Sequence, residues 1–251
     1  MRYMLRLAYS GLGFHGWQRQ PNASSVQQTL EEALAVILRH PVELTGAGRT
    51  DAGVHARTMF AHFDTEASIT SHEKFLISLN RLSGHNIAVQ ELINVQDDAH
   101  ARFDATSRTY KYFIASRKSP FLQDLSWFVP TPLNVDSMND AARLLLDTED
   151  FTSFAKLHSD AKTNICRVTE ASWENWENNF CVPGLVFTIT ADRFLRNMVR
   201  AVVGTLVEVG RGKLDTEGFR RVIEAKDRCV AGNSVPPQGL FLWDITYPYL
   251  K

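Results

Sequence analysis

A glycine-rich segment at residues 46–56, GAGRTDAGVHA, holds the side chains best suited to chemistry. It places Arg49 two residues before Asp51, with His55 shortly after. Glycine lets a backbone turn tightly and approach a ligand closely, so the segment predicts a loop that presents a carboxylate. An aspartate in such a loop also commonly bonds its own backbone in an Asx turn. Taken alone, the segment favours a structural turn over a reactive carboxylate.

An early loop adds aromatic side chains to this set. Phe14, His15 and Trp17 lie within FHGWQRQPN at residues 14–22. Together with an acid and an arginine, such surfaces suit a flipped or splayed nucleic-acid base better than a structural turn. The glycines of residues 46–56 match neither GxGxxG nor GxxxxGK[ST], so they do not form a phosphate-binding loop of those types.

A third segment, SRTYKY, combines basic and aromatic residues on an expected strand. Arg108, Tyr110 and Tyr112 would share one face, because side chains alternate along a strand. That face could stack a base and contact phosphate, or it could be an ordinary sheet face with cross-strand packing.

A fourth segment, FLRNMVR, ends in an arginine among apolar residues. On an expected helix over residues 193–209, Arg193, Arg196 and Arg200 form a polar stripe. Valine and alanine flank Arg200, so we expect a partly buried guanidinium that needs an anionic partner. A catalytic carboxylate is one candidate, and such a pair would hold the carboxylate ionised.

Strands and helices alternate along the chain to position these segments. Strands are expected at residues 1–10, 42–45, 57–65, 87–95, 106–116, 169–176, 185–191 and 239–247, and helices at 26–40, 72–82, 136–146, 193–209 and 216–225. The strands alternate in polarity, which favours an α+β fold with a largely antiparallel sheet and helices packed on it. We expect two similar subdomains that share the central sheet and form a basic cleft, with the Asp loop in residues 1–103 and the tyrosine strand and arginine helix in residues 104–251.

Charge is balanced overall but uneven locally. The 251 residues carry 27 Lys and Arg against 28 Asp and Glu, a net charge of −1. Residues 102–118 and 193–213 nevertheless hold five basic residues and one acid each. Local clusters of basic residues attract a phosphate backbone at short range. Solvent-exposed faces whose charges are balanced by acidic residues nearby in space would give the same sequence pattern.

Other features restrict the location and the chemistry. No apolar run approaches the ~20 residues of a membrane span, so no membrane association is expected. Three widely spaced cysteines favour the cytoplasm over a disulfide framework or a zinc site. No GxSxG or HExxH motif is present.

At GAGRTDAGVHA the chain resembles the tRNA pseudouridine synthase A family. Four further stretches resemble that family in the same order: GFHGWQRQPNASSVQQTLEEAL, AHARFDATSRTYKY, FLRNMVRAVVGTLVEVGRGK and PPQGLFLWDITYP. The resemblance implies a pseudouridine-synthase-type fold and an isomerase that converts uridine to pseudouridine at positions 38–40 of the tRNA anticodon arm. It also implies a cytoplasmic homodimer that uses no metal and no organic cofactor.

The resemblance implies a role for individual residues as well. Asp51 is the catalytic aspartate, and Arg49 helps to extrude the target nucleotide. Tyr110 packs on the uracil and serves proton transfer, Arg200 pairs with Asp51, and Leu240 lines the uracil pocket. Further contacts with tRNA or uracil are expected from Phe14, His15, Trp17, Arg108 and Arg196.

Some alternatives stay open. Asp51 could attack C1′, attack C6 or remove the 2′ proton. The chain lacks an expected acidic residue at residues 10–13 and an expected arginine beside Thr163, which leaves tRNA contacts near residues 161–168 open. An RNA-binding module without catalysis would not need Asp51, Tyr110 and Arg200 together, and a hydrolase of a phosphorylated or nucleoside substrate would predict a metal requirement.

Overall fold

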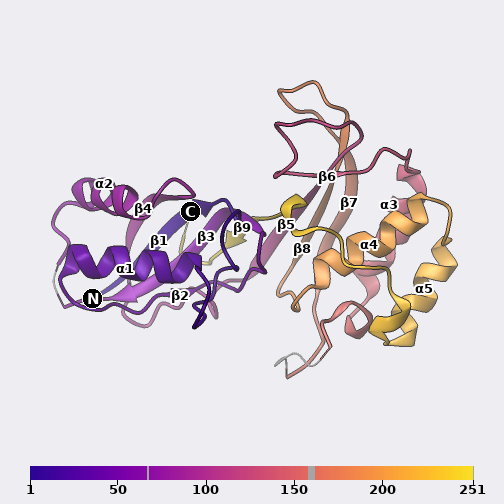
Figure 1. The fold of residues 1–251 in the computed structure, drawn as a ribbon. Helices are drawn as coiled ribbons and strands as arrows, with labels where there is room; N and C mark the ends of the chain where they lie inside the picture. The colour runs from indigo at the N-terminus through magenta and orange to yellow at the C-terminus, as the bar shows by residue number, and fades with distance from the viewer. Residues whose placement is uncertain (67, 158–161, 251) are drawn as a thin grey trace. The chain divides into compact units, whose positions relative to one another are not determined.

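The computed structural model describes residues 1–66, 68–157 and 162–250 (Figure 1). The chain divides into two compact units: Met1–Thr106 together with Leu242–Lys251, and Ser107–Phe241. The expected division between residues 103 and 104 differs from this one mainly after residue 241, where the chain returns to the first unit. The segment at residues 161–168 begins outside the described residues.

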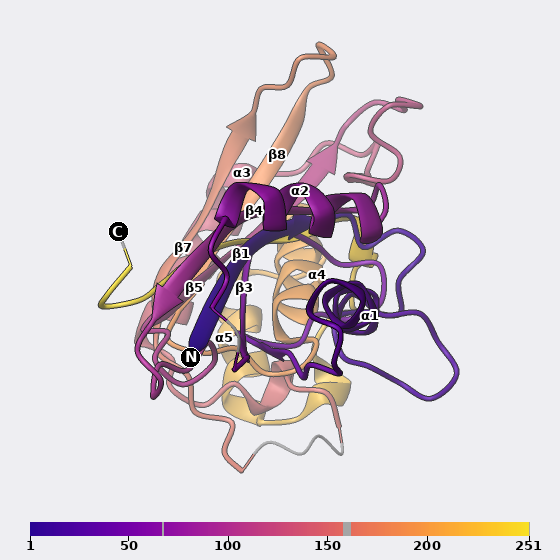
Figure 2. The same ribbon diagram turned by 90° about the vertical axis from the view of Figure 1, so that its left-hand side faces the viewer.

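The first unit is an antiparallel sheet with two helices. Its elements are β1 (Arg2–Tyr9), α1 (Val26–Leu38), β2 (Thr45–Gly46), β3 (His55–Asp64), α2 (His72–Leu82), β4 (Ile87–Val95) and most of β9 (Leu240–Thr246). β1 lies between β4 and β3, with Leu5 opposite both Leu92 and Ala61. β9 follows on the other side of β3. α1 contacts α2, and α2 lies along β4 (Figure 2).

Serine caps begin both helices of this unit. The side chain of Ser25 accepts a hydrogen bond from the Gln28 amide, and that of Ser71 accepts one from the Lys74 amide. Each bond satisfies an amide that has no partner within the helix. α1 ends two residues earlier than expected because Arg39 takes a left-handed conformation, with φ at 61°.

The second unit combines antiparallel strands with helices packed on them. Its elements are β5 (Ser107–Ala115), β6 (Trp127–Phe128), α3 (Val135–Arg143), η1 (Leu144–Asp147), η2 (Thr152–Phe154), β7 (Val168–Trp176), β8 (Gly184–Ala191), α4 (Met198–Gly210), α5 (Thr216–Ala225), η3 (Arg228–Val230) and η4 (Pro237–Gly239). β8 pairs antiparallel with β5 and β7. α4 is buried nearly all round and contacts α3 and α5, which makes it the core of this unit.

The arginine segment departs from its expected helix. α4 begins at Met198 rather than at Arg193, because Asn197 takes a left-handed φ of 66°. Asparagine tolerates that conformation better than most residues do. The expected helical stripe of Arg193, Arg196 and Arg200 is therefore wrong, since only Arg200 lies in the helix.

The expected fold class is confirmed. Both units combine strands with helices packed on them. The pairs β1–β3, β1–β4, β2–β3, β5–β8 and β7–β8 run antiparallel, and the short pair β5–β6 runs parallel. Across the part of the chain that the structure describes, no helix is both long and apolar enough to cross a membrane.

Two histidines hold the segment that leads out of the first unit. The Ala101 amide donates to His62 Nδ1 at 3.1 Å, and the Arg102 amide donates to His100 Nδ1 at 3.1 Å. A ring nitrogen that accepts carries no proton, so both imidazoles are neutral. Their ring centroids lie 4.7 Å apart, edge to face. Burial, with a smaller contribution from Arg2, lowers the pKa of His62 to about 4, and burial also lowers the pKa of His100.

Acidification is expected to destabilise the first unit through His62. The pKa of His62 is 6.5 in the unfolded chain and about 4 in the folded one. The unfolded state therefore takes up a proton first, and the free energy of unfolding falls as the pH drops from 6.5 toward 4. Above that window His62 contributes no pH dependence. Urea unfolding at a series of pH values measures the slope.

His62→Asn is the matched variant for this prediction. Its side-chain oxygen can still accept from the Ala101 amide, but it does not titrate. We expect a flatter pH dependence of the unfolding free energy in the variant. A decline as steep as that of the unchanged protein would contradict a role for His62.

Candidate functional site

The Asp loop, residues 46–56, connects two paired strands of the first unit. Gly46 in β2 lies opposite Ala61 in β3, and β3 itself begins at His55. The Ala47 amide donates to the Phe60 carbonyl at 2.8 Å. The loop therefore leaves and re-enters the same part of the sheet, so both of its ends are fixed.

Asp51 lies in a main-chain turn. The Val54 amide donates to the Asp51 carbonyl at 3.2 Å, and Gly53 supplies the left-handed conformation with φ at 76°. The backbone closes this turn, so closure does not depend on the carboxylate as it would in an Asx turn. The Asp51 side chain is half-buried.

Thr50, directly before Asp51, is anchored from the core. Its hydroxyl forms a buried hydrogen bond with the Tyr9 hydroxyl at 2.8 Å. Its carbonyl accepts from the Trp17 amide at 3.3 Å. These two bonds tie the residue beside the carboxylate to β1 and to the early loop.

Gly16 of the early loop and Gly11, three residues before that loop, pack directly against the Asp loop. A β carbon on Gly16 would lie 2.4 Å from the Thr50 carbonyl oxygen, and one on Gly11 would lie 2.4 Å from that of Val54. Only glycine permits such an approach of two backbones. Gly48, within the Asp loop, has open space around it. The close approach therefore comes from the facing loop, which sequence reasoning missed. Residues 11–16 do fit the GxGxxG spacing, but a loop follows them rather than a helix.

Trp17 is a core residue. Its side chain is 2 % exposed and lies 6.1 Å from the Tyr9 ring. A β carbon on Gly46 would lie 2.5 Å from the indole. The expected contact of Trp17 with a base is therefore corrected to a packing role beneath the Asp loop. Phe14 is half-buried and His15 is exposed, and their contacts with RNA stay predictions.

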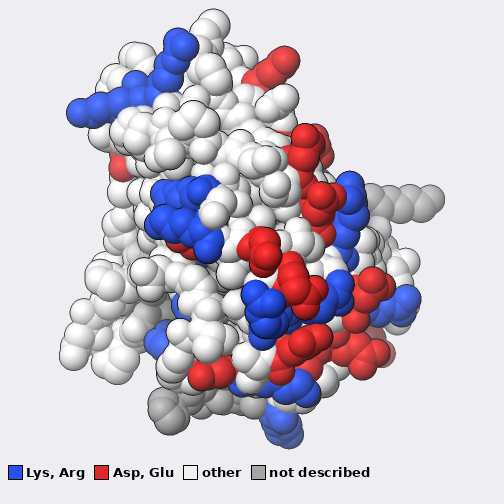
Figure 3. Space-filling model, turned by 90° about the vertical axis from the view of Figure 1, so that its right-hand side faces the viewer, with Lys and Arg blue, Asp and Glu red and all other residues white. Residues whose placement is uncertain are grey.

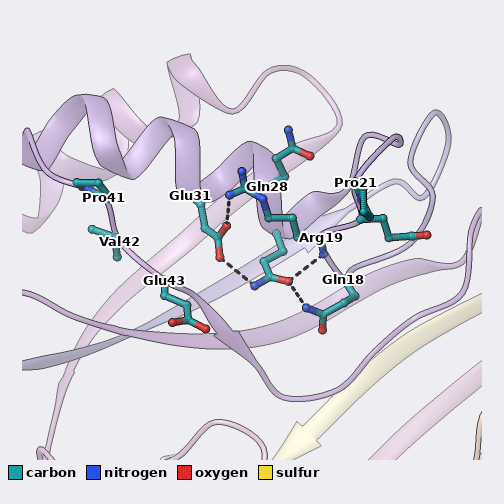
Figure 4. A pocket seen from close by; sticks show the side chains of 10 residues that line it. Gln18, Arg19, Pro21, Gln28, Glu31, Pro41, Val42 and Glu43 are labelled. Atoms are coloured by element: carbon teal, nitrogen blue, oxygen red, sulfur yellow. Dashed lines mark hydrogen bonds and ion pairs between the residues drawn. The ribbon is translucent and has the colours of Figure 1, made fainter. Parts of the chain in front are cut away.

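Arg49 is held by a polar network at the start of α1. Its Nε donates to Gln18 Oε1 at 3.1 Å, and Gln18 Nε2 donates to Gln27 Oε1 at 2.9 Å. Gln27 Nε2 in turn donates to Glu31 at 2.9 Å. The network borders a groove of about 780 Å³ that also includes Arg19 and Glu43 (Figure 4). Sequence reasoning missed Gln27 and Glu31, although two polar residues four apart on the apolar side of α1 were a signal.

In the second unit, the two tyrosines of β5 have different environments. Tyr110 is half-buried, and its ring lies edge to face with Phe194 at 5.0 Å. Tyr112 is fully buried, its hydroxyl donates to the Pro236 carbonyl at 2.9 Å, and burial raises its pKa. The two tyrosines therefore do not form one exposed aromatic face as expected, because Tyr112 belongs to the core. Arg108 donates to the Asp192 carbonyl at 2.8 Å.

Arg200 is half-buried, as its neighbours in the sequence predict. Its Nε donates to the Val235 carbonyl at 2.7 Å, and the Val235 amide donates back to the Arg200 carbonyl at 3.2 Å. Arg196 is exposed, and Leu240 is buried at the start of β9. Asp51 belongs to one unit and Arg200 to the other, so their pairing stays a prediction.

Figure 3 shows the face of the second unit that carries α5, where acidic and basic side chains are mixed. Glu208 pairs with Arg211 at 2.8 Å and with Lys213 at 3.0 Å. Two of the five basic residues in the stretch 193–213 are thus neutralised locally. This face does not form a stripe of one sign.

No group of three or more His, Cys, Asp and Glu side chains is arranged to hold a metal ion within residues 1–66, 68–157 and 162–250.

Known proteins resemble this chain along nearly all of its length. A family model described as tRNA pseudouridine synthase matches residues 7–104 and 141–248. These ranges contain Asp51, Arg200 and Leu240, whereas Tyr110 lies between them.

Individual relatives agree with this match. A protein from Parabacteroides distasonis, named tRNA pseudouridine synthase A, is 56% identical over 98% of this chain and 96% of its own. A protein of the same name from Bacteroides thetaiotaomicron is 55% identical over 98% and 91%, and one from Caldicellulosiruptor bescii is 39% identical over 97% and 98%.

Proposed function

Because the chain belongs to the tRNA pseudouridine synthase family, we propose that it converts uridine to pseudouridine at positions 38–40 of the tRNA anticodon arm. The reaction breaks the N1–C1′ glycosidic bond, turns the uracil and joins C5 to C1′. C5 gives up a proton and N1 gains one, so the product is an isomer of the substrate. The family match, which includes the Asp loop held at both ends by the sheet, carries this proposal.

Asp51 supplies the carboxylate that acts on the target nucleotide. The main-chain turn and the Thr50–Tyr9 bond hold its backbone in place, so the carboxylate needs little reorganisation when a nucleotide arrives. Arg49, two residues away, contacts the RNA backbone and helps to extrude the uridine. Arg200 pairs with Asp51 and orients its carboxylate.

Tyr110 and Leu240 form the surfaces that receive the uracil. The Tyr110 ring packs on the base, and its hydroxyl takes part in the removal of the C5 proton. Leu240 keeps water from the detached uracil.

The protein acts as a homodimer in the cytoplasm.

The purified protein tests this proposal directly. It would be incubated with unmodified tRNA transcripts that carry uridine at position 38, 39 or 40, and pseudouridine would be mapped chemically. We expect modification at these positions and none in transcripts that carry cytidine there. Binding without modification would favour an RNA-binding module, and turnover that a chelator does not affect would count against a metal-dependent hydrolase.

Tyr110→Phe is expected to lower kcat by about 10²–10⁴-fold, the usual range for a lost proton-transfer group. KM should change little, because the ring that packs on the uracil remains. Single-turnover rates on an anticodon-arm substrate measure the effect.

Tyr112→Phe is the matched control, two residues along the same strand. It loses the hydrogen bond to Pro236 and about 1 kcal/mol of stability, but no group that reacts. Equal losses of kcat in the two variants would contradict the role of Tyr110.

A further inference from the structure

We propose that Gln18, Gln27 and Glu31 form a polar relay that positions Arg49 for contact with the RNA backbone. The inference rests on the proposed function, because it assigns the relay to the nucleotide-extruding step. All members lie in the first unit, and each link is a hydrogen bond of 2.9–3.1 Å. These residues act through Arg49, so they are positioning residues rather than catalytic ones.

Glu31 is the fixed end of the relay. It is 7 % exposed, and its Oε1 accepts from the Leu44 amide at 3.1 Å as well as from Gln27. Its Oε2 accepts from Arg19 at 3.0 Å. A buried carboxylate is stable only when it is paired and hydrogen-bonded, and these three donors meet that requirement. Leu44 lies just before β2, so Glu31 also ties α1 to the entrance of the Asp loop.

The contacts of Gln27 with Glu31 and Leu44 fix the orientation of the Gln27 side-chain amide. Its Nε2 donates to Glu31 Oε1 and to the Leu44 carbonyl, both at 2.9 Å. Carboxylate and carbonyl oxygens only accept, so the amide nitrogen must face them and the amide oxygen must face the other way. That oxygen accepts from Gln18 Nε2 at 2.9 Å and from the Arg19 amide at 3.0 Å. The hydrogen-bonding capacity of the Gln27 side chain is fully used.

The orientation of the Gln27 amide in turn fixes the orientation of the Gln18 amide, which faces Arg49. Because its Nε2 donates to Gln27, its Oε1 is directed to Arg49 and accepts from Nε at 3.1 Å. This bond uses only the Nε of the guanidinium. The two terminal nitrogens are not required for it, and they are the donors suited to a phosphate group.

The exposed Arg49 side chain would otherwise sample many rotamers. The relay restricts it from the protein side and leaves its terminal nitrogens for the RNA. The buried amide and carboxylate thus fix the direction of a group on the surface, two residues from Asp51.

A double-mutant cycle tests the relay on the intact protein. Gln18→Ala and Arg49→Ala would be made singly and together, and kcat/KM measured on an anticodon-arm substrate. If Gln18 acts through Arg49, Gln18→Ala alone should lower kcat/KM about tenfold and should add nothing once Arg49 is absent. Gln28→Ala is the control, since Gln28 bonds the exposed Glu32 on the same helix and should leave kcat/KM unchanged.

Each outcome decides between the possibilities. A tenfold loss from Gln18→Ala in both backgrounds would overturn the relay, because it would reflect general damage to the fold; thermal unfolding of each variant reports such damage separately. An Arg49→Ala variant as active as the unchanged protein would overturn the relay as well. Absence of pseudouridine formation by the unchanged protein would instead overturn the proposed function.

Discussion

Replacing Asp51 by Asn is expected to abolish pseudouridine formation while tRNA still binds. The amide is nearly the same size as the carboxylate, so the turn closed by the Asp51 carbonyl and the Val54 amide should persist. What is lost is the negative oxygen that acts on the nucleotide, and loss of such a group lowers kcat by on the order of 10³-fold or more. Pseudouridine mapping measures the reaction, and filter binding measures the Kd for tRNA.

Asp98→Asn provides the comparison, since Asp98 is an exposed aspartate of the same unit. It should leave both the reaction and the binding unchanged. Substantial activity in the Asp51→Asn variant would remove Asp51 from the mechanism. A loss of tRNA binding equal to the loss of activity would assign it to binding instead.

Gly16→Ala is expected to disable the protein without any change to a reactive group. The new methyl would lie 2.4 Å from the Thr50 carbonyl oxygen and 3.2 Å from the Asp51 carbonyl carbon. Residue 16 also has φ at 92°, which disfavours any residue with a β carbon. The combined strain should lower the free energy of unfolding by about 3 kcal/mol. A displacement of the Asp loop by about 1 Å should also cost about 10²-fold in kcat.

Gly48→Ala is the control that tests whether any alanine substitution in the Asp loop lowers stability and activity. Gly48 lies two residues before Thr50, but a β carbon there meets no atom within 4 Å. Its free energy of unfolding should stay within about 0.5 kcal/mol of the unchanged protein. Urea denaturation of both variants gives the comparison. Equal stability of the Gly16→Ala and Gly48→Ala variants would contradict the close packing of the two loops.

The sequence predicts the regular elements well wherever hydrophobic period and caps agree. α1 and α2 begin at Val26 and His72 as expected, because a helical apolar pattern starts at each of these residues. The start of α4 could not be located in this way. Phe194 and Leu195 are spaced four residues from Met198 and Val199, which imitates one more helical turn, and the left-handed conformation of Asn197 depends on its surroundings. The two-residue strand β6 is too short to leave a pattern.

The candidate site likewise has some features that the sequence predicts and others that it does not. Gly, Arg and Asp in one short loop are visible in sequence, but the partners that hold the loop come from distant segments. An aromatic residue in a loop can be a base-stacking surface or a core residue, and Trp17 became core because Gly46 leaves room for its ring. Gln27 and Glu31 look like ordinary polar helix residues in the sequence, but the structure shows both to be buried.

The path of the chain through the first unit also sets an order of assembly on the ribosome. β9 lies beside β3, and Tyr247 just after it packs edge to face on Phe60 and donates a hydrogen bond to the Ala101 carbonyl. Translation delivers this strand only after the whole second unit has been made. Until then, the part of β3 that does not pair with β2 has an unpaired edge in the nascent first unit, which other chains can join. The strand that follows the Asp loop therefore gains its β9 neighbour only after the second unit has been made.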